Sequence, residues 1–280
     1  MGQARINVSE VEQSAASVQP ETPTPADVHE PAAATHPAHE REGFAGASQS
    51  LAATIAIAVF VITFIIQAFQ IPSESMEDTL LVGDYLLVDK THYGPSDDWS
   101  YVMPYREIRR GDIIVFKYPV HPSQHFVKRV IGLPGDRVRL ANKRLFVNGK
   151  LQREDYVVNS LPFDSFRDNF PNGPLESPGV EAFWYLQVRK LVEDGELIVP
   201  AGHYFVLGDN RDWSRDSRYW GFVPKENVVG RPLVIYLSLD MPEKEDIAGV
   251  GTSDKLSRFT YVVTHVFQII RWKRTMRIVH

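Results

Sequence analysis

Two serines and one lysine are the residues of this chain best suited to nucleophilic chemistry. Ser73 and Ser75 stand in Phe-Gln-Ile-Pro-Ser-Glu-Ser-Met (69–76), directly after a long apolar run, and Lys128 stands in the apolar run 125–131. A serine hydroxyl becomes a nucleophile when a nearby base takes its proton. A lysine amine can be that base once burial lowers its pKa from about 10.4 toward neutrality.

These residues on their own leave other interpretations open. A lysine in an apolar strand is more often an edge residue, or one whose amine reaches water. The polar stretch Gly-Asp-Asn-Arg-Asp-Trp-Ser-Arg-Asp-Ser-Arg-Tyr-Trp-Gly (208–221) follows an apolar strand. It fits either an exposed, salt-bridged turn or a shell that orients a buried amine through hydroxyl and charge contacts.

Other catalytic and metal-binding signatures are missing from the sequence. The chain has no cysteine, which excludes disulfides, thiol nucleophiles and cysteine metal sites. It has no Gly-x-Ser-x-Gly, His-Glu-x-x-His or Gly-x-x-x-x-Gly-Lys motif. Its nine histidines are scattered. We therefore expect neither a metal nor a cofactor.

Charge is concentrated at the N-terminus. Residues 1–48 contain two arginines and seven acids, which account for the whole net charge of −5. The balanced remainder gives no broad surface for nucleic acid. Residues 1–48 are also rich in Pro, Ala, Glu, Ser and Thr, and they cannot bury enough apolar surface to offset chain entropy. We expect a disordered acidic tail there.

The apolar run that precedes the serines predicts a membrane anchor. Residues 51–69 are interrupted only by Thr54, Thr63 and Gln67, and about 20 apolar residues span a bilayer as a helix. A buried soluble helix would usually carry a polar stripe, which this run lacks. The long acidic start does not fit a cleaved signal peptide. We expect an uncleaved anchor helix over 49–70, with its orientation undecided by charge.

After residue 76 the chain predicts a mainly β fold. Short β-like runs separated by turn signals indicate a catalytic domain built on an antiparallel sheet, in two parts, 71–150 and 201–280, around an irregular β insertion at 151–200. A hairpin is expected around Ala141-Asn142, and a few helical turns within 181–192. The expected strands are 85–89, 113–118, 126–132, 137–140, 145–147, 204–207, 228–230 and 233–239. Residues 259–270 are too short to span a membrane, and we expect a last strand pair there; the alternative is a basic rim facing anionic lipid.

Five stretches together resemble bacterial signal peptidase I, a membrane-anchored serine peptidase that removes signal peptides. They occur in the order of the family and cover the catalytic core to about residue 240. The matching stretches are Phe-Gln-Ile-Pro-Ser-Glu-Ser-Met (69–76), Gly-Asp-Tyr-Leu-Leu-Val-Asp-Lys (83–90), Arg-Gly-Asp-Ile-Ile-Val-Phe-Lys-Tyr-Pro (110–119), Phe-Val-Lys-Arg-Val-Ile-Gly-Leu-Pro-Gly-Asp (126–136) and Gly-Asp-Asn-Arg-Asp-Trp-Ser-Arg-Asp-Ser-Arg (208–218).

The resemblance implies a role for each matching residue. Ser75 would be the nucleophile and Lys128 the general base, with the Ser75 N–H and the Ser73 hydroxyl as oxyanion hole. Ser214 would hydrogen-bond the Lys128 amine. The pairs Arg129–Asp209 and Asp216–Arg218 would hold the loop against the strand, with Asp112 also in a supporting role. Pockets for an Ala-x-Ala-like site would be formed by Phe69, Ile71, Met76, Leu80, Leu86, Val115 and Val127.

The resemblance also implies a location and partners. The β domain would lie on the outer, extracytoplasmic face of the bacterial cell (inner) membrane, held by one helix beside the lipid, and the substrates would be exported preproteins. The oligomeric state stays open. Two departures from the family are Asp78, where proline is usual, and Trp213, where asparagine is usual. Two rival functions are self-cleavage of the bacterial-repressor type, against which the apolar helix argues, and a non-catalytic tethered β domain.

Overall fold

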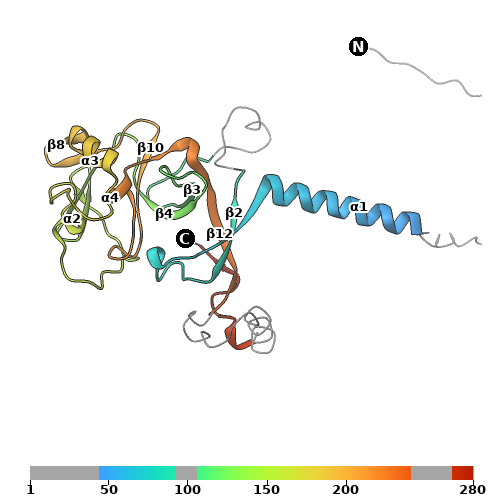
Figure 1. Cartoon of the computed structure of the whole chain (residues 1–280). Helices are drawn as coiled ribbons and strands as arrows, with labels where there is room; N and C mark the ends of the chain where they lie inside the picture. Colours follow the sequence, from blue (N-terminus) through green and yellow to red (C-terminus); the bar gives the residue numbers. More distant parts are fainter. Residues whose placement is uncertain (1–43, 92–105, 241–266, 280) are drawn as a thin grey trace, which may run out of the picture. The chain divides into compact units, whose positions relative to one another are not determined.

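The computed structural model describes residues 44–91, 106–240 and 267–279, and it confirms the mainly β fold (Figure 1). Two antiparallel sheets contain all the named strands of the described residues. The predicted tail at 1–48 lies largely outside the described residues. The helical elements are α1 (Phe44–Phe60), η1 (Val61–Ile65), η2 (Glu74–Met76), α2 (Ser165–Asp168), α3 (Ala182–Val188), η3 (Arg189–Leu191), α4 (Ser217–Trp220) and η4 (Lys225–Asn227).

The first sheet is organised around one long strand, β12. Its neighbours β2 and β3 pair with different parts of β12, as Figure 1 shows. The sheet contains, in spatial order, β1 (Ile66–Gln70), β2 (Asp84–Asp89), β12 (Val228–Ser238), β3 (Ile113–Lys117), β4 (His125–Gly132), β10 (His203–Leu207) and β11 (Val223–Pro224), with β13 (Arg277–Ile278) also on β12.

The sequence predicted two strands where β12 is continuous. Pro232 lies between the two predicted runs and has no N–H to donate to a ladder. The strand accommodates it by a register shift against β2 between Pro232 and Val234. A bulge of this kind lets a proline stay within a strand.

The first sheet curls until its edge strand β1 comes close to β4. The rings of Phe69 on β1 and His125 on β4 are 5.3 Å apart, although β2, β12 and β3 separate these strands in the sheet. Phe69 and Val127 pack on the same apolar cluster, which also contains Val115 of β3. The concave side of the curl therefore brings β1, β3 and β4 around one apolar surface.

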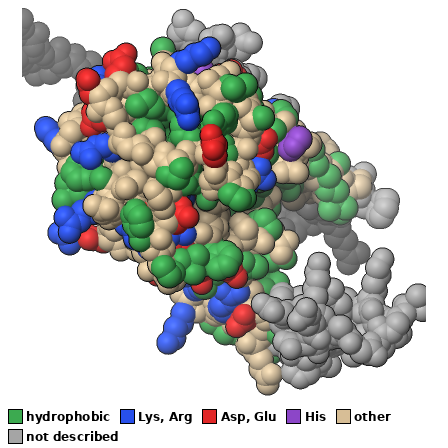
Figure 2. All heavy atoms as spheres, turned by 60° about the vertical axis from the view of Figure 1, so that its left-hand side comes forward, with side chains coloured by type: hydrophobic (Ala, Val, Ile, Leu, Met, Phe, Trp, Pro, Cys, Tyr) green, Lys and Arg blue, Asp and Glu red, His purple; other side chains and the backbone are tan. Residues whose placement is uncertain are grey.

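The second sheet packs on a second apolar core, to which β4 and β10 of the first sheet also contribute. Its strands, in order, are β7 (Lys150–Leu151), β6 (Arg144–Val147), β5 (Arg137–Ala141), β9 (Glu196–Ile198) and β8 (Val192–Glu193). The predicted hairpin joins β5 to β6, and its turn residues Asn142 and Lys143 have positive φ of 50° and 66°, as a two-residue hairpin turn requires. Figure 2 shows the face on this side of the molecule, over which cations, anions and apolar side chains are interspersed.

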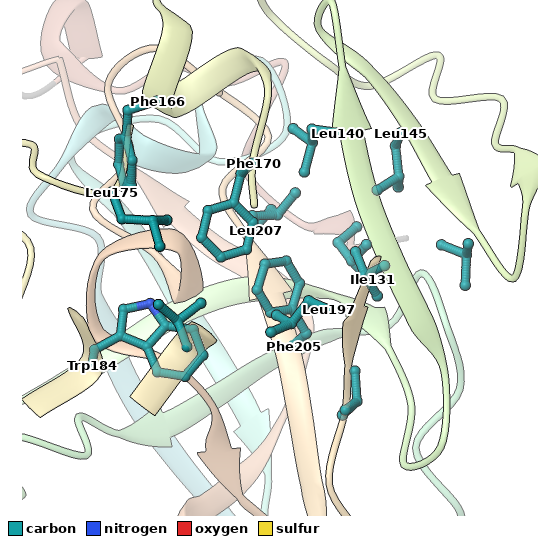
Figure 3. Packing of buried hydrophobic residues seen from close by; sticks show 14 residues of the cluster. Ile131, Leu140, Leu145, Phe166, Phe170, Leu175, Trp184, Leu197, Phe205 and Leu207 are labelled. Carbon is teal, nitrogen blue, oxygen red and sulfur yellow. The ribbon is translucent and has the colours of Figure 1, made fainter. Parts of the chain in front are cut away.

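The predicted insertion packs into this second core. Three aromatic residues of the insertion are buried against strand residues such as Leu140 and Phe205 (Figure 3): Phe166 on α2, Phe170 just after α2, and Trp184 on α3. Large aromatic side chains of this kind bury 150–250 Å² each and dominate the stability of a core. The proline- and aromatic-rich stretch is therefore a packed part of the catalytic domain.

The N-terminal apolar run is helical, but it ends earlier than predicted. Residues Gly46–Thr63 have a mean hydropathy of 1.7 and form the one candidate membrane span of the described residues, with none of it buried in the protein. The expected helix to residue 70 is wrong, because Ile66–Gln70 form β1. Five residues of β1 pair with β2, from Ile66↔Asp89 to Gln70↔Tyr85, so sheet pairing replaces the helical hydrogen bonds.

The C-terminal strand also differs from the prediction. Of the predicted strand at 259–270, residues 259–266 lie outside the described residues, and 267–269 are helical. Ile270 makes only an isolated bridge with Leu239. The strand that pairs with β12 is β13, further along the chain.

Candidate active site

Ser75 is held in the one-turn helix η2, just after β1. Its side chain is largely buried, with the residue 6% exposed. Its carbonyl accepts a hydrogen bond from the Asn210 N–H at 3.2 Å. Pro72 precedes the turn, and a proline restricts the residues around it to extended conformations. The hydroxyl is thus carried on a short, anchored turn.

The Lys128 amine lies against this hydroxyl. Lys128 Nζ and Ser75 Oγ are 2.5 Å apart, and Nζ also donates to the Val127 carbonyl at 3.0 Å. Lys128 is 4% exposed, so the interpretation in which its amine reaches water is wrong. Burial is the main cause that lowers the pKa of Lys128 to about 8, against the opposing effects of Asp216 and Asp209. A neutral amine in contact with a serine hydroxyl can take its proton.

Both predicted ion pairs are present. Arg129 donates to both oxygens of Asp209, at 2.8 and 2.7 Å. Arg218 donates to both oxygens of Asp216, at 2.8 Å each. Burial opposes ionisation of Asp216, but the Arg218 guanidinium holds its pKa below the ordinary value. The loop 208–218 therefore packs against β4 through two buried, bidentate pairs rather than forming an exposed turn.

Ser214 does not make the predicted contact. Its Oγ is buried, and among the described residues it makes no hydrogen bond to the Lys128 amine. The hydroxyl is instead near the Asp216 carboxylate, where it helps Arg218 to hold the pKa of that carboxylate below its ordinary value. The side chain nevertheless lies close to the site. A Cβ added to Gly208 would come within 2.2 Å of Ser214 Oγ and 2.4 Å of the Ser75 carbonyl oxygen. Ser214 and the nucleophile turn thus meet over a glycine that leaves no room for a side chain.

Ser73 lies beside Ser75, with the two Oγ atoms 3.4 Å apart. Ser73 itself is exposed, so its hydroxyl can rotate toward a substrate. Asp112 is buried and accepts the Arg109 N–H at 2.8 Å, which fixes the turn that leads into β3.

All the predicted pocket residues belong to one apolar cluster. Phe69 and Val127 are its half-buried members, and the others are buried within it. The buried members of the predicted set are Ile71, Met76, Leu80, Leu86 and Val115. A surface backed by packed, branched side chains accepts only small groups, because widening it would disturb the core.

Sequence reasoning missed three residues that support the loop. Glu154 contacts Arg211, Tyr156 lies over Arg129, and Thr79 donates to Asp209 at 2.6 Å. The arginines of the loop 208–218 would need carboxylate partners if they were buried, but no local sequence pattern identifies Glu154 as one of those partners. The described residues contain no cluster of acids and histidines fit to hold a metal.

Comparisons with known proteins agree with this geometry. The profile of the family described as signal peptidase, peptidase S26, matches residues 46–237. The chain belongs to the signal peptidase family, peptidase S26. Signal peptidase I of Pseudomonas fluorescens is 40% identical over 195 residues, which cover 65% of this chain and 68% of that protein. Signal peptidase I of Aquifex aeolicus is 39% identical over 216 residues, which cover 66% and 80%.

A solved structure of a signal peptidase I from Enterococcus faecalis is 38% identical and covers 45% of this chain and 97% of its own, with a TM-score of 0.34. The function is that of a signal peptidase I, a serine peptidase that removes signal peptides. Like its family, the protein is anchored in a membrane, and α1 with η1 supplies the candidate span.

Asp78, where the family resemblance would lead one to expect proline, has a backbone conformation that proline cannot adopt. Asp78 has a φ of 70°, whereas proline is fixed near −65°. The preceding Glu77 is extended, with φ −51° and ψ 150°. Leu80 N–H closes this five-residue turn on the Met76 carbonyl at 2.7 Å. Because proline cannot adopt a positive φ, the turn after Ser75 excludes proline at position 78.

We expect Asp78→Pro to destabilise the protein by more than about 1 kcal/mol and to lower signal-peptide cleavage, because proline cannot adopt the left-handed conformation. Asp78→Gly keeps that conformation and should stay within about 1 kcal/mol of wild type. Thermal unfolding and a cleavage assay measure both. A proline variant as stable and as active as wild type would show that the turn does not need a positive φ.

Proposed function

We propose that Ser75 is the nucleophile and Lys128 the general base of signal-peptide cleavage. The observation that supports this most is the 2.5 Å contact of Ser75 Oγ with a buried lysine amine. The lowered pKa of that amine, about 8, keeps part of it neutral near physiological pH. Because a neutral amine has a free electron pair, it can accept the hydroxyl proton.

The proposed reaction has two steps. Neutral Lys128 takes the Ser75 proton while Oγ attacks the scissile carbonyl, and the carbonyl electrons move onto oxygen. The Ser75 N–H and the Ser73 hydroxyl stabilise that oxyanion. The lysine ammonium then gives its proton to the leaving amine as the peptide bond breaks. In the second step the amine takes a proton from water, which attacks the acyl-enzyme, and the same proton returns to Ser75.

The substrate is proposed to lie extended between β1 and the first half of β4. Among the described residues, β10 pairs with β4 only from Arg129 onward, and β1 pairs on one side only, with β2. These two open edges can each donate and accept backbone hydrogen bonds with an extended peptide. The half-buried Phe69 and Val127 would contact the small side chains of the Ala-x-Ala-like site.

The protein is proposed to be a single-pass protein of the bacterial cell membrane, with the β domain on the outer face. A second contact with lipid is proposed for the apolar–basic patch, which we define as Phe267, Trp272, Lys273, Met276, Arg277 and Ile278. Its apolar members are 56–76% exposed, and both cations are exposed among them. Exposed aromatic residues beside cations suit an anionic membrane surface.

Ser75→Ala and Lys128→Met should each abolish cleavage of a preprotein and leave the fold intact. Lys128→Met should also stabilise the protein at pH 7. The pKa of Lys128 is about 8 in the folded protein, against 10.5 for a lysine in water. Keeping the buried amine charged therefore costs about 3 kcal/mol of folding stability. The full cost applies below pH 8, and it is absent above pH 10.5. Single-turnover cleavage and urea unfolding measure these effects. Cleavage by purified Lys128→Met at the wild-type rate would refute the assignment.

The pH dependence of wild-type cleavage provides a second prediction. Because only the neutral amine acts as base, kcat/KM should rise with pH through about 8, the pKa of Lys128. At pH 6 the rate should be about a hundredfold below its alkaline plateau, since the neutral fraction falls tenfold per pH unit. A profile that is flat between pH 6 and pH 9 would contradict a lysine base.

The patch predicts a membrane-specific effect. Met276→Ser should slow cleavage of a membrane-bound preprotein in anionic vesicles several-fold. The reason is that the protein loses the free energy of burying the Met276 side chain in lipid, about 25 cal/mol per Å² of apolar surface. It should not affect cleavage of a short soluble peptide in detergent. The control is Leu186→Ser on α3, since Leu186 is 69% exposed and Met276 71%. Equal effects of the two substitutions, or none in vesicles, would reject lipid contact at the patch.

A further inference from the structure

The segment 154–158, which follows β7, runs across the loop that supports the nucleophile. Val158 N–H donates to the Asp209 carbonyl at 2.9 Å, and the Arg211 N–H donates back to the Val158 carbonyl at 3.1 Å. These two backbone bonds form a parallel bridge between Val158 and Asn210. The segment therefore adds a short strand-like contact to the loop 208–218.

Side chains of the same segment contact two buried arginines. Glu154 accepts from Arg211 through both carboxylate oxygens, at 2.5 and 3.1 Å. The Tyr156 hydroxyl donates to Glu154 at 3.0 Å, and its ring lies 4.0 Å from the Arg129 guanidinium. Arg211 is 2% exposed. A buried guanidinium needs such a carboxylate, because an unpaired charge is costly to keep away from water.

Both arginines are connected to the reacting groups. Arg129 is the neighbour of Lys128 on β4 and holds Asp209, to which Thr79 of the nucleophile turn also donates. Arg211 donates to the Gly208 carbonyl at 3.2 Å and its own carbonyl accepts from Arg218 at 2.8 Å. Asn210, which lies between Asp209 and Arg211 in the loop, donates its N–H to the Ser75 carbonyl.

We propose that Glu154 and Tyr156 are positioning residues for the reaction, which hold Arg211 and Arg129 and thereby keep the loop 208–218 closed over Ser75 and Lys128. This inference rests on the proposed Ser75–Lys128 mechanism. If the loop moves away, water reaches the Lys128 amine and the desolvation of that amine is lost. Because neither residue touches the reacting atoms, their effect on cleavage passes through the base.

The charged groups around Lys128 decide the direction of that effect. Asp216 and Asp209 from the loop raise the pKa of Lys128 and Arg218 lowers it, but burial is the largest influence and lowers it. The neighbouring strand β3 places the uncharged Ile114 opposite Lys128, and η2 contributes Ser75. Opening the loop should therefore move the pKa of Lys128 upward, toward the value of a solvated lysine.

The test compares two adjacent acids in the full-length protein. Glu154→Gln removes the partner of Arg211, whereas Asp155→Asn, the control, removes only an exposed partner of Arg153, the two side chains being 74% and 87% exposed. We expect Glu154→Gln to lower kcat/KM at pH 7.5 at least about threefold and to shift the acidic limb of its pH profile upward by about half a unit or more, so that the deficit narrows at pH 10. Asp155→Asn should keep the wild-type profile.

A second variant and a rescue separate positioning from loss of fold. Tyr156→Phe removes the hydroxyl bond to Glu154 but keeps the ring on Arg129, and should shift the limb in the same direction by less. Glu154→Asp restores the charge and should recover part of the loss. If Glu154→Gln lowered kcat/KM by the same factor at every pH, or left the pH profile as in wild type, the proposal would be overturned. If wild type itself shows no limb near pH 8, it is the Ser75–Lys128 mechanism that fails.

Discussion

The burial of the Lys128 amine against the Ser75 hydroxyl is the interaction on which the rest of the site depends. Lowering the pKa from 10.5 to about 8 corresponds to about 3 kcal/mol of unfavourable desolvation of the ammonium. That is a large part of the net stability of an ordinary domain. Burying the lysine does not stabilise the fold, so the surrounding structure must keep water out and hold Lys128 Nζ against Ser75 Oγ.

The buried arginine–carboxylate pairs meet this demand by fixing geometry. Arg129–Asp209 and Arg218–Asp216 are bidentate, with side chains 0–6% exposed, and a planar guanidinium sets both the distance and the angle of its partner. Buried pairs add little net stability, since desolvation offsets their attraction, yet removing one partner is costly. They act as fixed spacers that define how the loop 208–218 sits on β4.

The contacts of Ser75, Lys128 and the loop 208–218 were predicted because five stretches of the sequence match the signal peptidase family in order. Taken alone, the dense charges of 208–218 fitted an exposed turn as well as a packed loop. Glu154 could not be found in this way, because it is 57 residues from Arg211, lies outside the five matching stretches and stands next to an exposed acid, Asp155. The end of the anchor was missed for a related reason. Ile66–Gln70 are apolar enough for a helix, and only their pairing with the distant β2 makes them a strand.

The early end of the helix sets the distance between the candidate membrane span and Ser75. Ser75 is ten positions after Ile65, the last residue of η1, and an extended chain of ten residues spans at most about 36 Å. Five of those residues form β1, the open edge along which an extended peptide can pair. The candidate membrane span, the open strand β1 and Ser75 are thus consecutive in the chain. An open apolar edge would be an aggregation hazard in a free protein, and anchoring in a membrane limits the encounters through which one copy could pair with another.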